Sequence, residues 1–386
     1  VSGLVYLAER RAEIVRNFLQ TVLDLLDQEV ELAGQEIQPG VMPASFIVRG
    51  EGMEQSLLAD FGNRAIGRVA PVDSMMWWTL LLYAYTHATG DTELVQREGF
   101  QRALRAVLSL CLQASFEVFP TLLVPDGSFM IDRRMGVHGH PLEIQALFFG
   151  MLQAMGTLRK GDGAQLLRAA KRRDSLRGYV RRCYWLDLPR LAQIHRYHCE
   201  EYGDDSVNFL NIFPESLPGW VEPWLPHDGG YLVGNLGPER LDVRFFAQGN
   251  LLAVLFGLAS EDQAHRLMAL YERRWDVLVG AMPAKICYPA MAGEEWRALT
   301  GCDPKNAAWS YHNGGNWPVL LWSFVAAALR CGRRDLAERA YAAAQRRLPG
   351  DRWPEYYDGR TGRLIGRRAN LHQVWSAAAL LLARRL

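Results

Sequence analysis

Helical periodicity is the feature that most constrains what this chain can fold into. Apolar residues recur at three- and four-residue spacing over most of its length, which is the pattern of amphipathic helices. Strand patterns do not alternate with these segments, so a doubly wound parallel sheet is excluded. Short strands are predicted only at Thr121–Val124, Phe129–Ile131 and Tyr231–Val233. The spacing predicts helices over residues 5–33, 75–89, 95–116, 142–158, 163–183, 187–202, 246–258, 261–278, 317–331, 334–347 and 372–386.

The number of helices favours a closed ring of helical hairpins. A chain of 386 residues leaves about 32 residues for each of about twelve helices with its loop, which suits an all-α, (α/α)6 barrel with short β elements in its loops. An all-α solenoid is the alternative, but no repeat of fixed length is present. No linker rich in Pro, Gly or Ser divides the chain, so residues 1–386 are predicted to form a single domain.

Composition excludes several classes of partner. The net charge is +1, from 43 Lys+Arg against 42 Asp+Glu, which gives no support for binding to nucleic acid or to a membrane surface. No uncharged apolar stretch reaches the roughly 18 residues of a membrane span, and the first 30 residues have the pattern of an amphipathic helix rather than a signal peptide. The 6 cysteines contain no CxxC pair and are too sparse for a disulfide framework, so a reduced, cytoplasmic setting is predicted.

The most ligand-like cluster is His195, His198 and Cys199, whose spacing places them on one helix face. A helix with half-buried polar residues is favoured over a metal site, because no second cluster with metal-site spacing accompanies it. The basic stretch Arg168–Arg182 is likewise taken as a solvated helix face rather than a phosphate-binding patch. Motifs for dinucleotides, phosphate loops, serine nucleophiles and zinc peptidases are absent, so no cofactor and no metal is predicted.

Carboxylates in aromatic and polar loops carry the strongest chemical signal. Asp132 precedes two arginines in MIDRR, and Glu355 lies among aromatic residues in WPEYYDG. A carboxyl in an aromatic setting has its charged form disfavoured, which suits acid–base work near neutral pH. Two carboxylates on distant loops that converge at a barrel mouth are what glycoside hydrolysis needs. On residue types alone, an ion pair of Asp132 with its neighbours Arg133 and Arg134 weighs about equally with catalysis, and so does a helix-start role for Glu355.

Further residues of the same loops are predicted to line the pocket. Aromatic faces stack on the apolar side of a sugar, and amide, imidazole, carboxylate and guanidinium groups bond its hydroxyls. For Asp73 a helix N-cap is the favoured alternative, and for Trp77 a place in the core. The predicted pocket residues are Asp73, Trp77, Arg133, His138, Glu143, Gln145, Tyr231, Asp242, His312, Asn316 and Trp317.

These segments resemble, in the same order, blocks of the alkaline/neutral invertases of plants and cyanobacteria, glycoside hydrolase family 100. The resemblance covers most of the chain from Val1 to Leu386, and runs this long and rich in rare residues are specific. The blocks are RVAPVDS, FPTLLVPDGSFMIDRRMG, HGHPLEIQALFF, GGYLVGNLGPERLDVRFFAQGN, WSYHNGGNWPVLLW and WPEYYDGRTGRLIG.

The resemblance implies an (α/α)6 barrel that hydrolyses sucrose to glucose and fructose without a metal. The family's catalytic pair maps onto Asp132, as the general acid that protonates the bridging oxygen, and Glu355, as the base that activates water from the opposite face in an inverting reaction. Arg133 and Arg134 lower the pKa of a neighbouring acid, so Asp132 must be kept protonated by burial or by another carboxylate. Family members carry an aromatic-rich stretch ahead of the region matching Val1, and a chain without it is expected to lack part of one sugar subsite.

The partners that follow are sucrose or a related small saccharide, with no nucleic acid and no membrane. A glycosidase for another disaccharide and a non-catalytic sugar-binding protein are the alternatives. Pairing of exposed barrel helices into a homo-oligomer is an option that the sequence leaves open.

Overall fold

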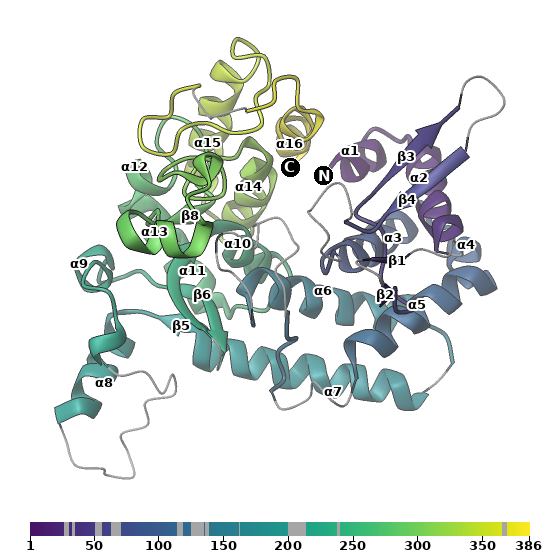
Figure 1. Cartoon of the computed structure of the whole chain (residues 1–386), viewed down its shortest axis with the longest axis horizontal. Helices are drawn as coiled ribbons and strands as arrows, with labels where there is room; N and C mark the ends of the chain where they lie inside the picture. Colours follow the sequence, from purple (N-terminus) through teal and green to yellow (C-terminus); the bar gives the residue numbers. More distant parts are fainter. Residues whose placement is uncertain are drawn as a thin grey trace. The chain divides into compact units, whose positions relative to one another are not determined.

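The structure is a computed structural model of the chain (Figure 1). It describes residues 1–26, 31–32, 35–50, 56–62, 71–113, 119–124, 135, 139–161, 163–199, 214–237, 240–364 and 369–386. Contacts group the chain into two compact units. We call residues 2–133 and 147–176 the N-terminal unit, and residues 134–146 and 177–386 the C-terminal unit. The single domain stays a prediction.

The N-terminal unit combines helices with two antiparallel hairpins. Helices α2 and α5 each bury one apolar face, and Trp78 of α3 stacks on Phe100 of α5 with ring centroids 5.8 Å apart. In the larger hairpin Ser45 pairs with Asp60 and Arg49 with Ser56. The elements are α1 (Ser2–Ala8), α2 (Ala12–Leu25), β1 (Glu31–Leu32), β2 (Gln35–Glu36), β3 (Ser45–Arg49), β4 (Ser56–Asp60), α3 (Ser74–Thr89), α4 (Thr92–Gln96), α5 (Glu98–Cys111), and parts of α6 (Leu142–Leu158) and α7 (Gly163–Tyr179).

The C-terminal unit packs helices around a small antiparallel sheet in the order β5-β6-β7-β8. Helix α14 packs against α10, α15 and α16 (Figure 1). The elements are a π-helix (Val180–Tyr184), β5 (Trp185–Leu186), α8 (Leu188–Cys199), a 3₁₀ turn (Pro214–Ser216), α9 (Val221–Trp224), β6 (Tyr231–Gly237), β7 (Arg240–Phe246), α10 (Ala247–Leu255), α11 (Glu261–Arg273), α12 (Trp275–Leu278), β8 (Cys287–Tyr288), α13 (Gly293–Thr300), 3₁₀ turns (Pro304–Asn306 and Pro318–Leu320), α14 (Leu321–Arg330), α15 (Arg334–Arg347) and α16 (Val374–Arg385).

A chain of edge-to-face aromatic contacts forms the core of the C-terminal unit. Tyr231 contacts Trp224 and Phe245, and Tyr271 contacts Phe245 and Phe324, with ring centroids 4.9–5.7 Å apart. These rings come from α9, the sheet, α11 and α14, so one aromatic run ties the sheet to the helices. Such pairs add about 0.5–1.5 kcal/mol each beyond the area they bury.

The helix predictions are largely confirmed, and two match the observed bounds, at Leu142–Leu158 and Arg334–Arg347. The prediction of a single helix over residues 5–33 is wrong. The segment breaks into α1 and α2 at Arg10, whose φ of 60° no α-helix accommodates. The segment 261–278 likewise divides into α11 and α12 at Arg274.

The strand predictions need more correction. Tyr231–Val233 lies within β6 and is confirmed, whereas Thr121–Val124 forms no strand and Phe129–Ile131 lies outside the described residues. The β3–β4 hairpin and the strand β7 were not predicted. The strand pairings of the described residues are all antiparallel, which agrees with the exclusion of a doubly wound sheet.

Candidate active site

Glu355 lies in the connection between α15 and α16, and hydrogen bonds to the segment before α16 and to its first turn fix its position. Arg352 and Trp353 both have positive φ, at 60° and 54°, which turns the chain sharply after α15. The N–H of Glu355 donates to the carbonyl of Asn370 at 2.8 Å. The hydroxyl of Ser376, in the first turn of α16, donates to the carbonyl of Pro354 at 2.8 Å. The carboxylate is therefore carried by a loop whose backbone is held on both sides.

The charge of Glu355 is set by opposing influences. Its residue is only 6% exposed, and burial raises its pKa, while the positive charge of Lys305 and hydrogen bonding from Asn370 work against that rise. Asn370 donates to Oε2 from its backbone N–H at 3.5 Å and from Nδ2 at 3.4 Å. Among the described residues no hydrogen bond reaches Oε1, so this oxygen keeps its capacity to accept one.

Aromatic side chains cluster around His312 in the C-terminal unit. His312 stacks on Tyr311 at 3.9 Å and lies 4.9 Å from Trp317, and Trp317 stacks on Tyr356 at 5.8 Å. Tyr356 follows Glu355 directly, so the cluster links the two loops. Burial, with a smaller contribution from Lys305, lowers the pKa of His312 to about 3. The imidazole is therefore neutral at physiological pH.

Lys285 joins the two loops through a buried amine. Its residue is 3% exposed, and its ammonium donates to Asn316 Oδ1 at 3.2 Å and to the carbonyl of Gly359. It also lies over the ring of Trp309 at 5.2 Å. Burial lowers the pKa of Lys285 to about 8. The loop that carries Glu355 is therefore anchored by the Lys285 amine at Gly359, four residues further along the chain.

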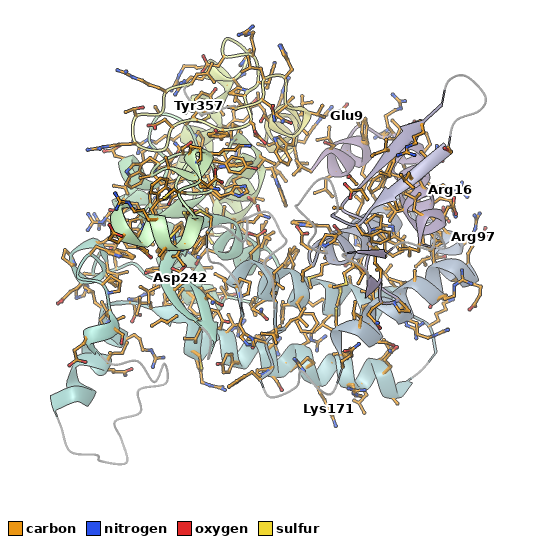
Figure 2. All side chains as sticks on the ribbon, viewed as in Figure 1. Glu9, Arg16, Arg97, Lys171, Asp242 and Tyr357 are labelled. Atoms are coloured by element: carbon orange, nitrogen blue, oxygen red, sulfur yellow. The ribbon has the colours of Figure 1, made fainter. Side chains whose placement is uncertain are left out.

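Asp242 lies on β7 (Figure 2). It forms a buried ion pair with Arg244, and both residues line a cavity of about 460 Å³. Arg244 Nη2 also donates to the carbonyl of Met135 at 3.2 Å. Met135 follows the MIDRR segment, so this arginine is bonded to the chain immediately after it. Asp242 thus sits in a cavity wall of the C-terminal unit.

The remaining predicted residues of that unit are deeply buried. Glu143, at the start of α6, accepts from Gln248 Nε2 at 3.0 Å, and Gln145 is fully buried in the same turn of the helix. Tyr231 is fully buried, and its hydroxyl donates to the carbonyl of Val243. Asn316 uses its side-chain amide on the carbonyls of Val279 and Met282.

Asp73 and Trp77 belong to the N-terminal unit. Asp73 occupies the N-cap position of α3, but its side chain makes no capping hydrogen bond there. Burial raises the pKa of Asp73 to about 7, which keeps part of its population protonated at neutral pH. Trp77 lies half-buried in the first turn of α3. Asp132, Arg133 and His138 lie outside the described residues.

Several functional-looking residues were not predicted. Lys305 approaches the ring of Tyr311 at 3.7 Å and acts electrostatically on both His312 and Glu355. The position of Lys285 in the sequence could have indicated a buried functional amine, because this residue is a lone charge in the apolar run from Ala281 to Tyr288. Asn370 and Lys305 carried none, since neither stands in an aromatic loop.

In the part of the chain that the structure describes, no group of His, Cys, Asp or Glu is arranged to hold a metal ion. The side chains of His195, His198 and Cys199 lie outside that part, although α8 contains all three. The described helices include none long and apolar enough to cross a membrane.

The sequence model described as alkaline and neutral invertase matches residues 1–386. The chain belongs to this family. It is 49% identical to neutral/alkaline invertase 1, mitochondrial, of Oryza sativa subsp. japonica over 100% of this chain and 63% of that protein. It is also 49% identical to alkaline/neutral invertase E, chloroplastic, of Arabidopsis thaliana over 100% of this chain and 64% of that protein. The chain thus spans under two thirds of the length of these relatives.

A relative with a different stated location is equally similar. Cytosolic invertase 1 of Oryza sativa subsp. japonica is 49% identical over 99% of this chain and 69% of its own length. The names of the family members therefore divide between cytosol, mitochondrion and chloroplast.

Solved structures share the fold of this invertase-family chain. The GH63 mannosylglycerate hydrolase from Thermus thermophilus, solved in complex with glucose, aligns with a TM-score of 0.58 at 13% identity. The alignment covers 99% of this chain and 91% of that chain. The same hydrolase in complex with Tris and D-glycerate gives a TM-score of 0.58 at 11% identity. The predicted fold class, an all-α protein of the (α/α)6 barrel type with short β elements, is confirmed.

Proposed function

We propose that this chain hydrolyses sucrose to glucose and fructose. The observation that carries the proposal is membership of the alkaline and neutral invertase family over the whole chain, joined to a buried carboxylate, Glu355, beside an aromatic cluster. Asp132 is the general acid of this proposal and protonates the bridging oxygen. Glu355 is the base that removes a proton from the attacking water.

Several features support the role of Glu355. A base must be ionised before it can accept a proton, and the charge of Lys305 and the two donors of Asn370 favour the carboxylate against the effect of burial. Hydrogen bonds from the described residues reach Oε2 alone, so Oε1 is the oxygen we assign to water. His312 is assigned to the sugar as a neutral hydrogen-bonding partner, and Trp317, which is 1% exposed, as the ring that supports His312 at the sugar site.

The proposal also covers the remaining pocket residues and the setting. Asp73, Trp77, Arg133, His138, Glu143, Gln145, Tyr231, Asp242 and Asn316 are proposed to line or support the sugar site.

A cytoplasmic location is proposed, supported by the cytosolic relative and by five described cysteines that are free thiols, Cys111, Cys183, Cys287, Cys302 and Cys331. We also propose one catalytic domain over residues 1–386, which a single cooperative melt tests, and ultracentrifugation tests for a homo-oligomer.

The deciding experiment measures glucose and fructose released from sucrose at pH about 7. The purified chain is compared with its Asp132→Asn variant. Equimolar products from the parent and none from a folded variant would support the assignment. Substantial turnover by the variant would remove Asp132 from the acid role. A folded parent that releases nothing from sucrose but cleaves another disaccharide would favour the alternative glycosidase, and calorimetric binding without any product would favour a sugar-binding protein.

The stereochemical course can be followed in the same reaction. An inverting enzyme with a water-activating base first releases the anomer opposite to that of the bond it cleaves. Proton NMR of the earliest product distinguishes the two courses before mutarotation. Retention would replace the base role of Glu355 with that of a nucleophile.

A further inference from the structure

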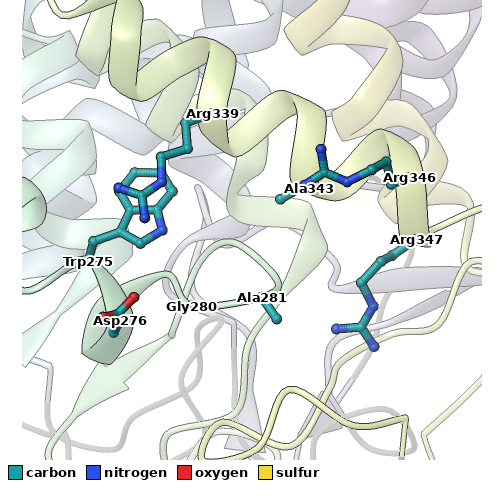
Figure 3. A pocket seen from close by; sticks show the side chains of 8 residues that line it. All are labelled: Trp275, Asp276, Gly280, Ala281, Arg339, Ala343, Arg346 and Arg347. Carbon is teal, nitrogen blue, oxygen red and sulfur yellow. The ribbon is translucent and has the colours of Figure 1, made fainter.

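A second cavity of the C-terminal unit is lined by arginines. Its volume is about 340 Å³, and it is lined by Arg339, Arg346 and Arg347 of α15, by Asp276 of α12 and by the turn at Gly280–Ala281 (Figure 3). The arginines stand seven and eight positions apart, which places them on one side of the helix. Glu355 and its aromatic cluster do not line this cavity.

The arginines on the two sides of the cavity are held by aromatic rings. The guanidinium of Arg339 lies 4.0 Å from the ring centroid of Trp275, and that of Arg347 lies 4.6 Å from that of Tyr357. A guanidinium that stacks on a ring keeps its N–H edge available for an anion. Arg339 is exposed and Arg347 half-buried, and the ring beside each guanidinium orients it, which lowers the cost of immobilising it on binding.

Arg346 stands with Arg347 on the side of the cavity opposite Arg339 and Trp275 (Figure 3). No hydrogen bond or ion pair to Arg346 occurs among the described residues, whereas Arg347 pairs with Asp351 at 3.3 Å. The lining side chains carry three positive charges and, in Asp276, one negative charge. Even with Arg347 neutralised by Asp351, the cavity keeps an excess of positive charge.

We propose that this cavity binds a small phosphorylated sugar. Arginine forks match phosphate oxygens in pairs, and charge-assisted bonds of this kind are among the strongest in proteins. Asp276 would repel a bare phosphate but accepts a hydrogen bond from a hydroxyl, and the volume falls in the range of small-molecule pockets. A sugar phosphate meets both requirements, because its phosphate pairs with the arginines and one of its hydroxyls donates to Asp276.

The test measures binding directly, so its outcome is independent of whether the chain hydrolyses sucrose. Glucose 6-phosphate, inorganic phosphate and glucose are each titrated into the purified chain at fixed ionic strength by calorimetry. We expect saturable binding of glucose 6-phosphate with a Kd below about 1 mM, and binding at least about tenfold weaker for the other two. No saturable binding of glucose 6-phosphate, or equal affinity for inorganic phosphate, would overturn the proposal.

Substitutions locate the site. Arg339→Gln and Arg346→Gln are each expected to weaken glucose 6-phosphate binding about tenfold or more, because each removes a charge-assisted bond. Arg334→Gln, an exposed arginine on the same helix outside the cavity, is the matched control and is expected to leave the Kd unchanged. Arg347 is not substituted because it also supports Tyr357.

Thermal melts establish that each variant is folded before titration. An equal weakening in Arg334→Gln would show diffuse attraction to a basic helix. Binding that survives both cavity substitutions would lie elsewhere, for instance at the sugar site of Glu355. Either result would overturn the proposal.

Discussion

Asn316 and Tyr357 pair through both of their backbone groups. The N–H of Asn316 donates to the carbonyl of Tyr357 at 3.0 Å, and the N–H of Tyr357 donates to the carbonyl of Asn316 at 2.8 Å. Trp317 follows the first residue and Glu355 precedes the second by two positions. A displacement of either loop therefore breaks backbone bonds of the other, and the position of the carboxylate depends on the aromatic loop.

Gly359 provides the first test of this coupling. A Cβ at this position would lie 1.6 Å from the carbonyl oxygen of Gly314, an atom of the backbone that cannot turn away. We expect Gly359→Ala to lower the free energy of unfolding by about 1–3 kcal/mol and to slow the sucrose hydrolysis that we propose, because the loops must separate. Gly350→Ala is the control, since the nearest atom to its Cβ would be 3.7 Å away. Equal urea midpoints for the two variants would contradict the close approach of the loops.

Glu355→Gln tests the carboxylate itself. The amide keeps the shape of the side chain and an oxygen that can accept from Asn370, so the variant is expected to melt as the parent does. Loss of the base that we propose should lower kcat for sucrose by about a hundredfold or more. Glu294→Gln, at a side chain that is 86% exposed, is expected to retain full kcat. Near-normal turnover by Glu355→Gln would remove it from the reaction.

The helices were predictable where local spacing and packing agree. In α6 and α15 the apolar pattern continues to both ends, so the predicted bounds match. The hairpin β3–β4 was missed because its strands are short and each is stabilised by the other, a pairing that a local pattern does not contain. The break at Arg10 was missed for a related reason, since the amphipathic pattern continues across it while the backbone turns.

The candidate site was only partly predictable. Glu355 could be selected because its charge stands among aromatic residues in one short segment. Lys285 could not be connected to that segment, since it reaches Gly359 across 74 positions of sequence. The interaction of Lys305 with His312 and Glu355 likewise depends on how distant loops meet, which local composition does not specify.

Lys285→Met tests the buried amine through its pH dependence. Burial lowers the pKa of Lys285 from 10.5 to about 8. Between these values the unfolded chain retains a proton that the folded chain has released, so this residue makes stability rise with pH, by at most about 1.4 kcal/mol per unit. The difference in unfolding free energy, parent minus variant, should therefore increase from pH 8 to pH 10.

The control for this experiment is Lys171→Met, which removes an exposed lysine of α7 (Figure 2). The difference in unfolding free energy between the parent and Lys171→Met is expected to stay constant over the same pH range. A flat difference for Lys285→Met as well would show that the buried amine has an ordinary pKa.

Asp242→Asn tests the buried ion pair of the sheet. The side chains of Arg244 and Asp242 are 6% and 3% exposed, so removing the carboxylate leaves a guanidinium with no neutralising partner on its own strand. We expect the free energy of unfolding in urea to fall by about 3–5 kcal/mol. The substitution should also weaken the anchoring of Met135, three positions after Asp132, because Arg244 donates a hydrogen bond to its carbonyl.

The matched control is Asp228→Asn, which breaks the exposed pair with Arg273 at 3.1 Å. Water solvates both of those groups, so little measurable loss is expected. The double variant Asp242→Asn/Arg244→Met removes the unpaired charge and is expected to recover part of the lost stability. A loss in Asp242→Asn no larger than in the control would mean that water reaches Arg244 and that the pair does not order this part of the sheet.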